Sequence, residues 1–238
     1  MAVYLPELTA DPTWFPPLAT AWSNPDGLLA VGGDLSVARL QQAYRQGVFP
    51  WYGPEDPLLW WTPSIRAVFA PGQLQLNRSL RKYQQHQQYQ FSRNQAFDQV
   101  IAQCAALPRK NQQGTWIVPA MQQAYRALHQ AGVAHSIEVW RDQQLVGGLY
   151  GLTIGGLFCG ESMFNLEANT AKLALIMLQQ QLQGYSAGWI DCQMPNAFLL
   201  QQGVQPLPKA AYLQLLQRLR DDPVPREVWT PAGLELQC

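Results

Sequence analysis

The feature that most constrains the fold of this chain is a pair of alternating apolar stretches in its second half. They run through Leu145–Ile154 and Leu157–Met163, with Gly155-Gly156 between them. Alternation predicts two half-buried strands, and the glycine pair predicts the turn of a β-hairpin. Neither stretch carries a charge before Glu161, which we expect at a strand end. An ionisable group in such a place needs a compensating partner.

A third short strand, ending on Asp191 and Gln193, is predicted after an intervening helix. Alternation points these two side chains to one face of the strand, and Ile190 and Cys192 to the other. Together with Glu161, they put three polar groups at strand ends in apolar surroundings. Each such group costs about 1–3 kcal/mol if nothing compensates it. The pattern therefore indicates a functional site, and a simple strand-end cap is the alternative for Asp191.

Helical periodicity follows the hairpin and recurs along the chain. Lys172–Gln183 is apolar on most sides, which predicts a buried helix that begins at Asn169 or Thr170 and ends at Gly184. From Arg66 onward the order of elements predicts an α+β layer. The other predicted elements are a helix between Asp34 or Ser36 and Gly47, strands at Arg66–Phe69 and His135–Trp140, and helices at Leu80–Gln88, Asn94–Ala106, Val118–Gln130 and Ala211–Arg220.

The composition is that of a globular protein. With 238 residues, 47% of them hydrophobic and 13% charged, the chain can bury a sizeable core in one large domain, alone or with a small one. No apolar stretch approaches the roughly 20 residues that span a bilayer, and the first residues lack the pattern of a secretory signal. The four cysteines show no CxxC spacing. We therefore expect no metal, no cofactor, no membrane partner and a cytoplasmic location.

Positive charge is concentrated in one part of an otherwise neutral chain. The formal net charge of zero argues against a nucleic-acid binder. Between Pro71 and Lys110, however, basic residues clearly outnumber acidic ones. Arg78, Arg81 and Lys82 fall at i, i+3 and i+4 and share one helix face. A solvated face is the ordinary interpretation of this triplet, and contacts with nucleic-acid phosphates are the alternative.

These motifs resemble those of the leucyl/phenylalanyl-tRNA–protein transferases. The resemblance extends in order from about Asn24 to Leu215, through NPDGLLAVGGDLS, AYRQGVFPWY, LLWWTP, GTWI, HSIEVW, FCGESMF and DCQ. It implies an enzyme that moves Leu, Phe or Met from aminoacyl-tRNA to the N-terminal α-amino group of proteins starting with Arg or Lys, which marks them for N-end-rule degradation. It also implies a small loop-rich N-terminal domain, residues 1–65, and a catalytic domain, residues 66–238, similar to the GNAT acyltransferases.

The resemblance also assigns roles to individual residues. Asp191, relayed through the amide of Gln193, would position the acceptor amine or help to deprotonate it, and Glu161 would recognise the acceptor or the amino group of the donor. Trp51 would lie near the terminal adenosine of the tRNA, and Arg78, Arg81 and Lys82 would bind the tRNA. The remaining candidates for substrate binding are Trp116, Tyr44, Tyr125, and an apolar donor pocket of Leu149, Phe158, Leu175, Leu178, Leu182 and Ile190.

Two other functions remain open for this chain. A coenzyme A-dependent N-acyltransferase would need a glycine-rich turn before the buried helix, and Phe164–Ala171 contains no glycine. A noncatalytic tRNA-binding module would need only the basic helix face. The segment after DCQ also departs from the usual family pattern: Phe198, Gln201, Gln202 and Gly203 stand where a His and a Ser-Leu-Gly run are common, and Ala171 stands where Ser is common.

Overall fold

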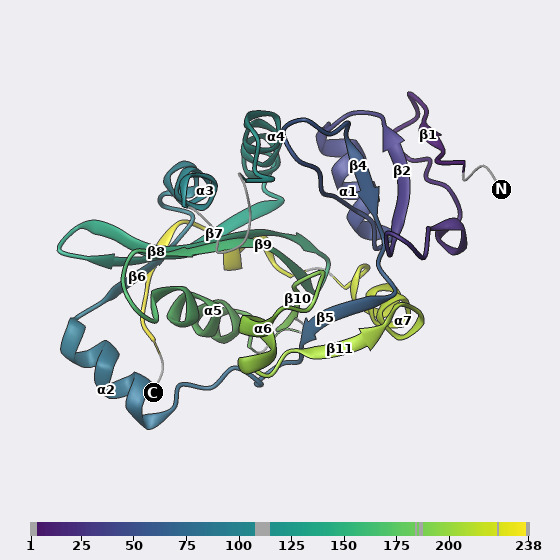
Figure 1. The fold of residues 1–238 in the computed structure, drawn as a ribbon. Helices are drawn as coiled ribbons and strands as arrows, with labels where there is room; N and C mark the ends of the chain where they lie inside the picture. Colours follow the sequence, from purple (N-terminus) through teal and green to yellow (C-terminus); the bar gives the residue numbers. More distant parts are fainter. Residues whose placement is uncertain (1–3, 108–114, 184, 186–187, 223, 237–238) are drawn as a thin grey trace.

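The computed structural model describes residues 4–107, 115–183, 185, 188–222 and 224–236. These residues form a small four-stranded sheet near the N-terminus and a large eight-stranded sheet that carries most of the remaining chain (Figure 1). The chain passes from the first sheet to the second between Trp61 and Ile65. The α+β class is confirmed, and the division into residues 1–65 and 66–238 stays a prediction. The predicted helix end at Gly184 lies outside the described residues.

The small sheet has the strand order β1-β2-β4-β3 and is accompanied by one α-helix, α1. The hydroxyl of Ser36 accepts a hydrogen bond of 3.3 Å from the backbone N–H of Arg39, so that Ser36, one of the two predicted starts, caps this helix. The buried face of α1 packs against the apolar side chains of the sheet. The elements are β1 (Glu7–Leu8), a 3₁₀ turn (Leu18–Thr20), β2 (Leu28–Gly32), α1 (Val37–Arg45), β3 (Phe49–Pro50) and β4 (Leu59–Trp61).

The large sheet has the strand order β11-β5-β10-β9-β8-β7-β6-β12. Its β9–β10 pair is parallel and its other pairs are antiparallel, which confirms the mostly antiparallel sheet. The hairpin turn lies at Gly155-Gly156, as predicted. The strands are β5 (Ile65–Phe69), β6 (Gln90–Arg93), β7 (Ala134–Arg141), β8 (Gln144–Ile154), β9 (Leu157–Asn165), β10 (Trp189–Asp191), β11 (Gln205–Pro208) and β12 (Ala232–Leu234).

Helices cover both faces of the large sheet (Figure 1). Helices α3 and α4 pack on one face, and the buried helix α5 packs on the other, beside the short helix α6. Two apolar cores result, one on each side of the sheet. The helices are α2 (Arg78–Gln87), α3 (Phe97–Ala106), α4 (Pro119–Gln130), α5 (Thr170–Gln181), α6 (Ala197–Gln201) and α7 (Lys209–Leu219), followed by a 3₁₀ turn (Arg226–Trp229).

The sequence analysis did not predict β6, β11 and β12. These strands are short, and none of them alternates cleanly between apolar and polar residues. Strand β11 contains Pro206 and Pro208, and it lies at the edge of the sheet, where proline removes no ladder hydrogen bond. Among the described residues, no helix is both long and apolar enough to span a membrane.

Candidate active site

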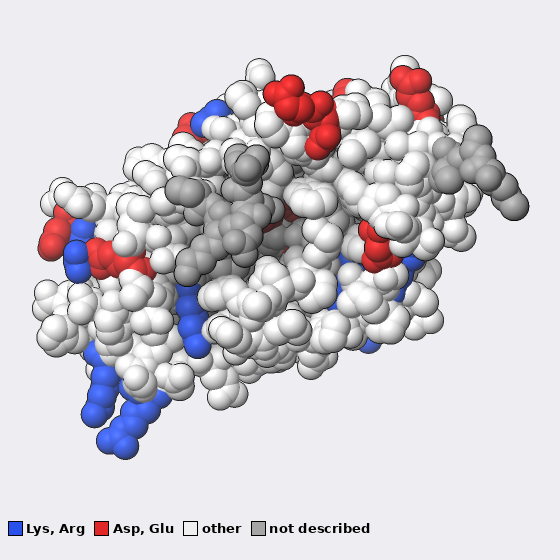
Figure 2. Space-filling view, viewed as in Figure 1, with Lys and Arg blue, Asp and Glu red and all other residues white. Residues whose placement is uncertain are grey.

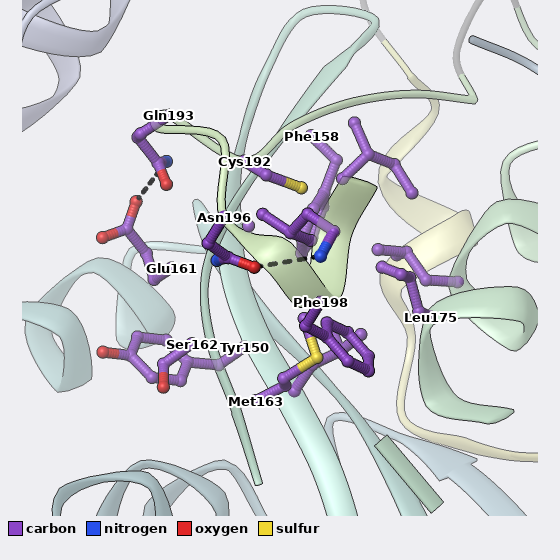
Figure 3. Close-up of a pocket in the computed structure, with 15 residues that line it drawn as sticks. Tyr150, Phe158, Glu161, Ser162, Met163, Leu175, Cys192, Gln193, Asn196 and Phe198 are labelled. Carbon is purple, nitrogen blue, oxygen red and sulfur yellow. Dashed lines mark hydrogen bonds between the residues drawn. The ribbon is translucent and has the colours of Figure 1, made fainter. Parts of the chain in front are cut away.

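An apolar cavity of about 270 Å³ lies between strands β8, β9 and β10 and helices α5 and α6 (Figure 3). Pockets for small ligands are typically about 300–1,000 Å³, so this cavity suits a small group such as one side chain. The predicted pocket residues that line it are Leu149, Phe158, Leu175, Leu178 and Ile190. Leu182 is buried in the same core but does not line the cavity. The rest of the lining is Tyr150, Gly160, Glu161, Ser162, Met163, Cys192, Gln193, Asn196, Phe198 and Leu199.

Glu161 lies in the middle of β9, so the prediction of a strand-end position is wrong. The pairing register of β8 with β9 shifts between Tyr150 and Gly151, which leaves Glu161 as the extra residue of a β-bulge. A bulge re-aims side chains and reverses the alternation beyond it. Phe158 before the bulge and Met163 after it therefore line the same cavity. Simple alternation would place Phe158 and Met163 on opposite faces of the strand.

The carboxyl group of Glu161 is held by two tyrosines and one glutamine. Tyr44 donates to Oε1 at 2.6 Å and Tyr125 to Oε2 at 2.7 Å. The two tyrosine hydroxyls lie 2.6 Å apart. The amide of Gln193 donates to Oε1 at 3.2 Å (Figure 3). Because Tyr44 belongs to α1 and Tyr125 to α4, this cluster connects the small sheet, a helix and the large sheet at the cavity.

Burial raises the pKa of the Glu161 carboxyl to about 7, although the hydrogen bonds from Tyr44 and Tyr125 lower it. With both tyrosines donating to the carboxylate, the 2.6 Å contact between the two hydroxyl oxygens contains no hydrogen. When the carboxyl is protonated, it can donate to one tyrosine, which can then donate to the other. The site thus contains an acid whose pKa is close to neutral pH, the range in which a group can both take and release a proton.

Asp191 lies at the end of β10 and is fully buried. Its carboxylate forms an ion pair with Arg66 of β5, and Arg66 Nε lies 3.2 Å from Oδ1. The hydroxyl of Tyr212 donates to Oδ2 at 2.9 Å, and the backbone N–H of Gln193 donates to Oδ1 at 3.0 Å. Arg66 also donates to the carbonyl oxygen of Gly47 at 3.0 Å. Both oxygens of Asp191 are therefore occupied by protein groups.

Asp191 and Gln193 do not share a face, so this prediction is also wrong. Strand β10 ends at Asp191, and Gln193 has a φ of +56°, a left-handed conformation that turns its side chain toward the cavity. Gln193 thereby lines the cavity with Ile190 and Cys192 (Figure 3). Asp191 bonds to the backbone N–H of Gln193, while the amide side chain of Gln193 bonds to Glu161. Asp191 thus fixes the turn from which the Gln193 amide reaches Glu161.

The other predicted site residues lie outside this cavity. Trp51 is half-buried and packs edge-on against Trp61, with ring centroids 5.5 Å apart. Trp116 is half-buried and packs against the core that includes residues of α3 and α4. Arg78 and Lys82 are exposed on α2, and Figure 2 shows basic side chains that project from this end of the molecule. The structure thus brings together Glu161, Gln193, Tyr44, Tyr125 and the apolar pocket, with Asp191 behind Gln193.

The described residues contain no group of three or more His, Cys, Asp or Glu side chains that could hold a metal ion. Burial raises the pKa of the Cys192 thiol, which disfavours a thiolate nucleophile at the cavity. Thr170 and Ala171, the first residues of α5, are buried, and the Thr170 hydroxyl bonds to the carbonyl of Val146 at 3.1 Å. The N-terminus of α5 is therefore covered, unlike the open cradle that a pyrophosphate needs.

Comparison with known proteins gives matches along most of the chain. The family described as leucyl/phenylalanyl-tRNA protein transferase matches residues 68–217, and the N-terminal domain of the same family matches residues 33–64. Curated relatives include the leucyl/phenylalanyl-tRNA–protein transferase of Tolumonas auensis, 48% identical over 99% of this chain and 100% of the relative. That of Shewanella piezotolerans is 52% identical over 97% of each chain, and that of Shewanella halifaxensis is 49% identical over the same shares.

The fold, the cavity and these matches identify an enzyme of the aminoacyltransferase class. The chain belongs to the leucyl/phenylalanyl-tRNA–protein transferase family. Of the residues that the sequence analysis expected to depart from the family pattern, Phe198 lines the cavity and Ala171 is buried in the first turn of α5.

Proposed function

We propose that this chain transfers Leu or Phe, and also Met, from aminoacyl-tRNA to the N-terminal α-amino group of proteins that begin with Arg or Lys. The observation that carries the proposal is an apolar cavity bordered by the hydrogen-bonded pair of Glu161 and Gln193. We further propose that the modified proteins are marked for N-end-rule degradation and that the enzyme acts in the cytoplasm.

The cavity fits the donor side chain. Its wall is largely aliphatic and aromatic, with Leu175 and Leu178 from α5 and Phe158 from the sheet. Such a surface favours an apolar side chain that is unbranched at Cβ. One methylene changes binding in an apolar pocket by only about 1–3 kcal/mol. We therefore expect Leu, Phe and Met to be accepted with modest differences in kcat/KM.

The reaction requires orientation and the movement of one proton. The acceptor nitrogen attacks the ester carbonyl carbon, a C–N bond forms, the C–O bond to the ribose breaks, and the ribose oxygen gains the proton that the amine loses. An α-amino group has a pKa of about 8, so much of it must be deprotonated on binding. Glu161, with a pKa of about 7, is suited to accept this proton. Gln193 would orient the amine, and orientation alone supplies roughly 7–11 kcal/mol in favourable cases.

The test is transfer of labelled Leu from Leu-tRNA by the purified protein to three acceptors that differ only in their first residue: Arg, Lys or Ala. The expected result is ribonuclease-sensitive incorporation into the Arg and Lys acceptors and little into the Ala acceptor. Binding of tRNA without incorporation would instead indicate a noncatalytic tRNA-binding module. Micromolar binding of acetyl-coenzyme A in calorimetry, with no incorporation, would indicate a coenzyme A-dependent acyltransferase.

A further inference from the structure

Phe158, a wall of the donor cavity, is the last ring of an aromatic stack that reaches it from the C-terminal segment. The rings of His135 and Trp229 are parallel, with centroids 4.0 Å apart and an angle of 7° between their planes. Trp229 stacks in turn on Phe158, at 5.8 Å and 29°. Phe158 lines the donor cavity, and Trp229 does not. Trp229 is therefore a second layer of that wall, behind Phe158.

The position of Trp229 is fixed by hydrogen bonds to the large sheet. The amide of Asn94 donates to the carbonyl oxygen of Trp229 at 2.6 Å and lies 3.1 Å from Nδ1 of His135. Arg93 Nε donates to the carbonyl oxygen of Thr230 at 2.6 Å, and β12 then pairs with β6. Burial lowers the pKa of His135 to about 3, so its ring is neutral at physiological pH. The stack thus rests on a fixed part of the sheet.

Phe158 has little freedom on its other side. A Cβ atom placed on Gly151 would lie 2.5 Å from Cε1 of Phe158, so the ring lies directly on the backbone of β8. With the sheet beneath the ring and Trp229 against it, Phe158 can move away from the cavity only if Trp229 becomes smaller. The size of residue 229 consequently limits the depth of the cavity.

We propose that Trp229 is a positioning residue that sets the depth of the donor pocket through Phe158, and with it the preference between Leu and Phe donors. This inference rests on the proposed aminoacyl transfer. Trp229 lies beyond residues 68–217, the part of the chain that matches the catalytic family domain. The C-terminal segment would therefore tune the specificity of a site built by the rest of the chain.

The test compares the ratio of kcat/KM for Phe-tRNA to kcat/KM for Leu-tRNA in the full-length protein and in Trp229→Leu. Loss of the indole lets Phe158 retreat and favours the larger donor, so the ratio should rise by about tenfold. Both kcat/KM values of a ratio come from the same preparation, so the fraction of folded enzyme cancels. Lower stability alone therefore does not change the ratio. The indole N–H of Trp229 has no hydrogen-bond partner among the described residues, so Trp229→Phe removes no such bond. Because Phe is intermediate in size between Trp and Leu, the ratio in Trp229→Phe should lie between those of the unmodified protein and Trp229→Leu.

Trp60→Leu is the matched control, because Trp60 is also buried but belongs to the small sheet. It should lower the melting temperature and leave the ratio unchanged. An unchanged ratio in Trp229→Leu, or an equal change in Trp60→Leu, would overturn the inference while the unmodified protein still transfers Leu. Absence of transfer by the unmodified protein would instead reject the proposed function.

Discussion

The hydroxyl of Tyr44 donates a hydrogen bond of 2.6 Å to the carboxyl group of Glu161, 117 positions later in the chain. Tyr44 lies on α1 beside the small sheet, and Glu161 lies at the bulge of β9 in the large sheet. The bond thus makes the environment of the cavity's carboxyl group depend on how the two sheets are packed together. A substitution in one part of the molecule should change the acidity of a group in the other.

Tyr44→Phe should raise the pKa of Glu161 above 7, because it removes a hydrogen bond that lowers this pKa. If the ionised carboxylate accepts the proton, the acidic limb of the kcat/KM profile should move to higher pH, as a pH titration of transfer would measure. Tyr89→Phe is the control, since Tyr89 donates to Glu167, which does not line the cavity. Identical acidic limbs in the unmodified protein and Tyr44→Phe would contradict the assignment of Glu161.

Glu161→Gln should change how stability depends on pH. The pKa of Glu161 is raised from 4.5 to about 7 on folding, so the folded state binds this proton more tightly. Its contribution to the free energy of unfolding is present below pH 4.5 and is lost as the pH rises through 7. The free energy of unfolding of the unmodified protein, relative to Glu161→Gln, should therefore fall between pH 5 and pH 8 in urea titrations. Parallel curves would show that the carboxyl group is not perturbed.

Asp191→Asn should lower both stability and turnover. It leaves the fully buried Arg66 without its counter-charge, which typically costs about 3–5 kcal/mol. The double variant Arg66→Met/Asp191→Leu should recover most of the stability in urea titrations, because apolar pairs often replace buried ion pairs without loss. Its turnover should remain about 10²-fold low, since the N–H of Gln193 has lost its acceptor. Normal turnover in the double variant would show that Asp191 has no role in positioning Gln193.

Gly151→Ala and Gly160→Ala should differ sharply in their stability. A methyl group on Gly151 would meet the carbonyl oxygen of Cys159 at 2.2 Å, whereas one on Gly160 would have 3.7 Å to its nearest neighbour. Gly151→Ala should lower the free energy of unfolding by about 1–3 kcal/mol, as overpacking does. Gly160→Ala should fold normally and, because Gly160 lines the cavity, raise the KM for aminoacyl-tRNA. Equal melting temperatures for the two variants would contradict the packing described here.

Arg78→Ala combined with Lys82→Ala should weaken tRNA binding without changing turnover at saturating tRNA. Each lost phosphate contact should reduce the slope of log K against log salt by roughly 0.7–0.9. Filter binding over a range of salt concentrations measures this slope. Arg218→Ala, an exposed arginine on α7, is the control and should leave the slope unchanged. An unchanged slope in the double variant would show that these residues of α2 do not contact tRNA phosphates and that the helix face is simply solvated.

Local patterns predicted the hairpin and the buried helix, because alternation and helical periodicity are properties of neighbouring residues. The bulge at Glu161 was not predictable in this way, since it depends on the register of β8 against β9. The left-handed Gln193 likewise depends on Asp191, which is itself held by Arg66 from another strand. One feature of the sequence did indicate the ion pair with Asp191. Arg66 interrupts the otherwise apolar strand Ile65–Phe69, and a buried arginine needs a carboxylate partner.

The place of β5 in the large sheet has a consequence for the kinetics of folding. This strand lies between β10 and β11, and it pairs Phe69 with Ile190, 121 positions away, and Arg66 with Leu207, 141 positions away. Contacts so distant in sequence require large loops to close before they contribute, and chains dominated by them fold slowly. The hairpin of β8 and β9 has no such requirement. Refolding should therefore form the β8–β9 hairpin side of the donor cavity first and the Arg66–Asp191 pair last.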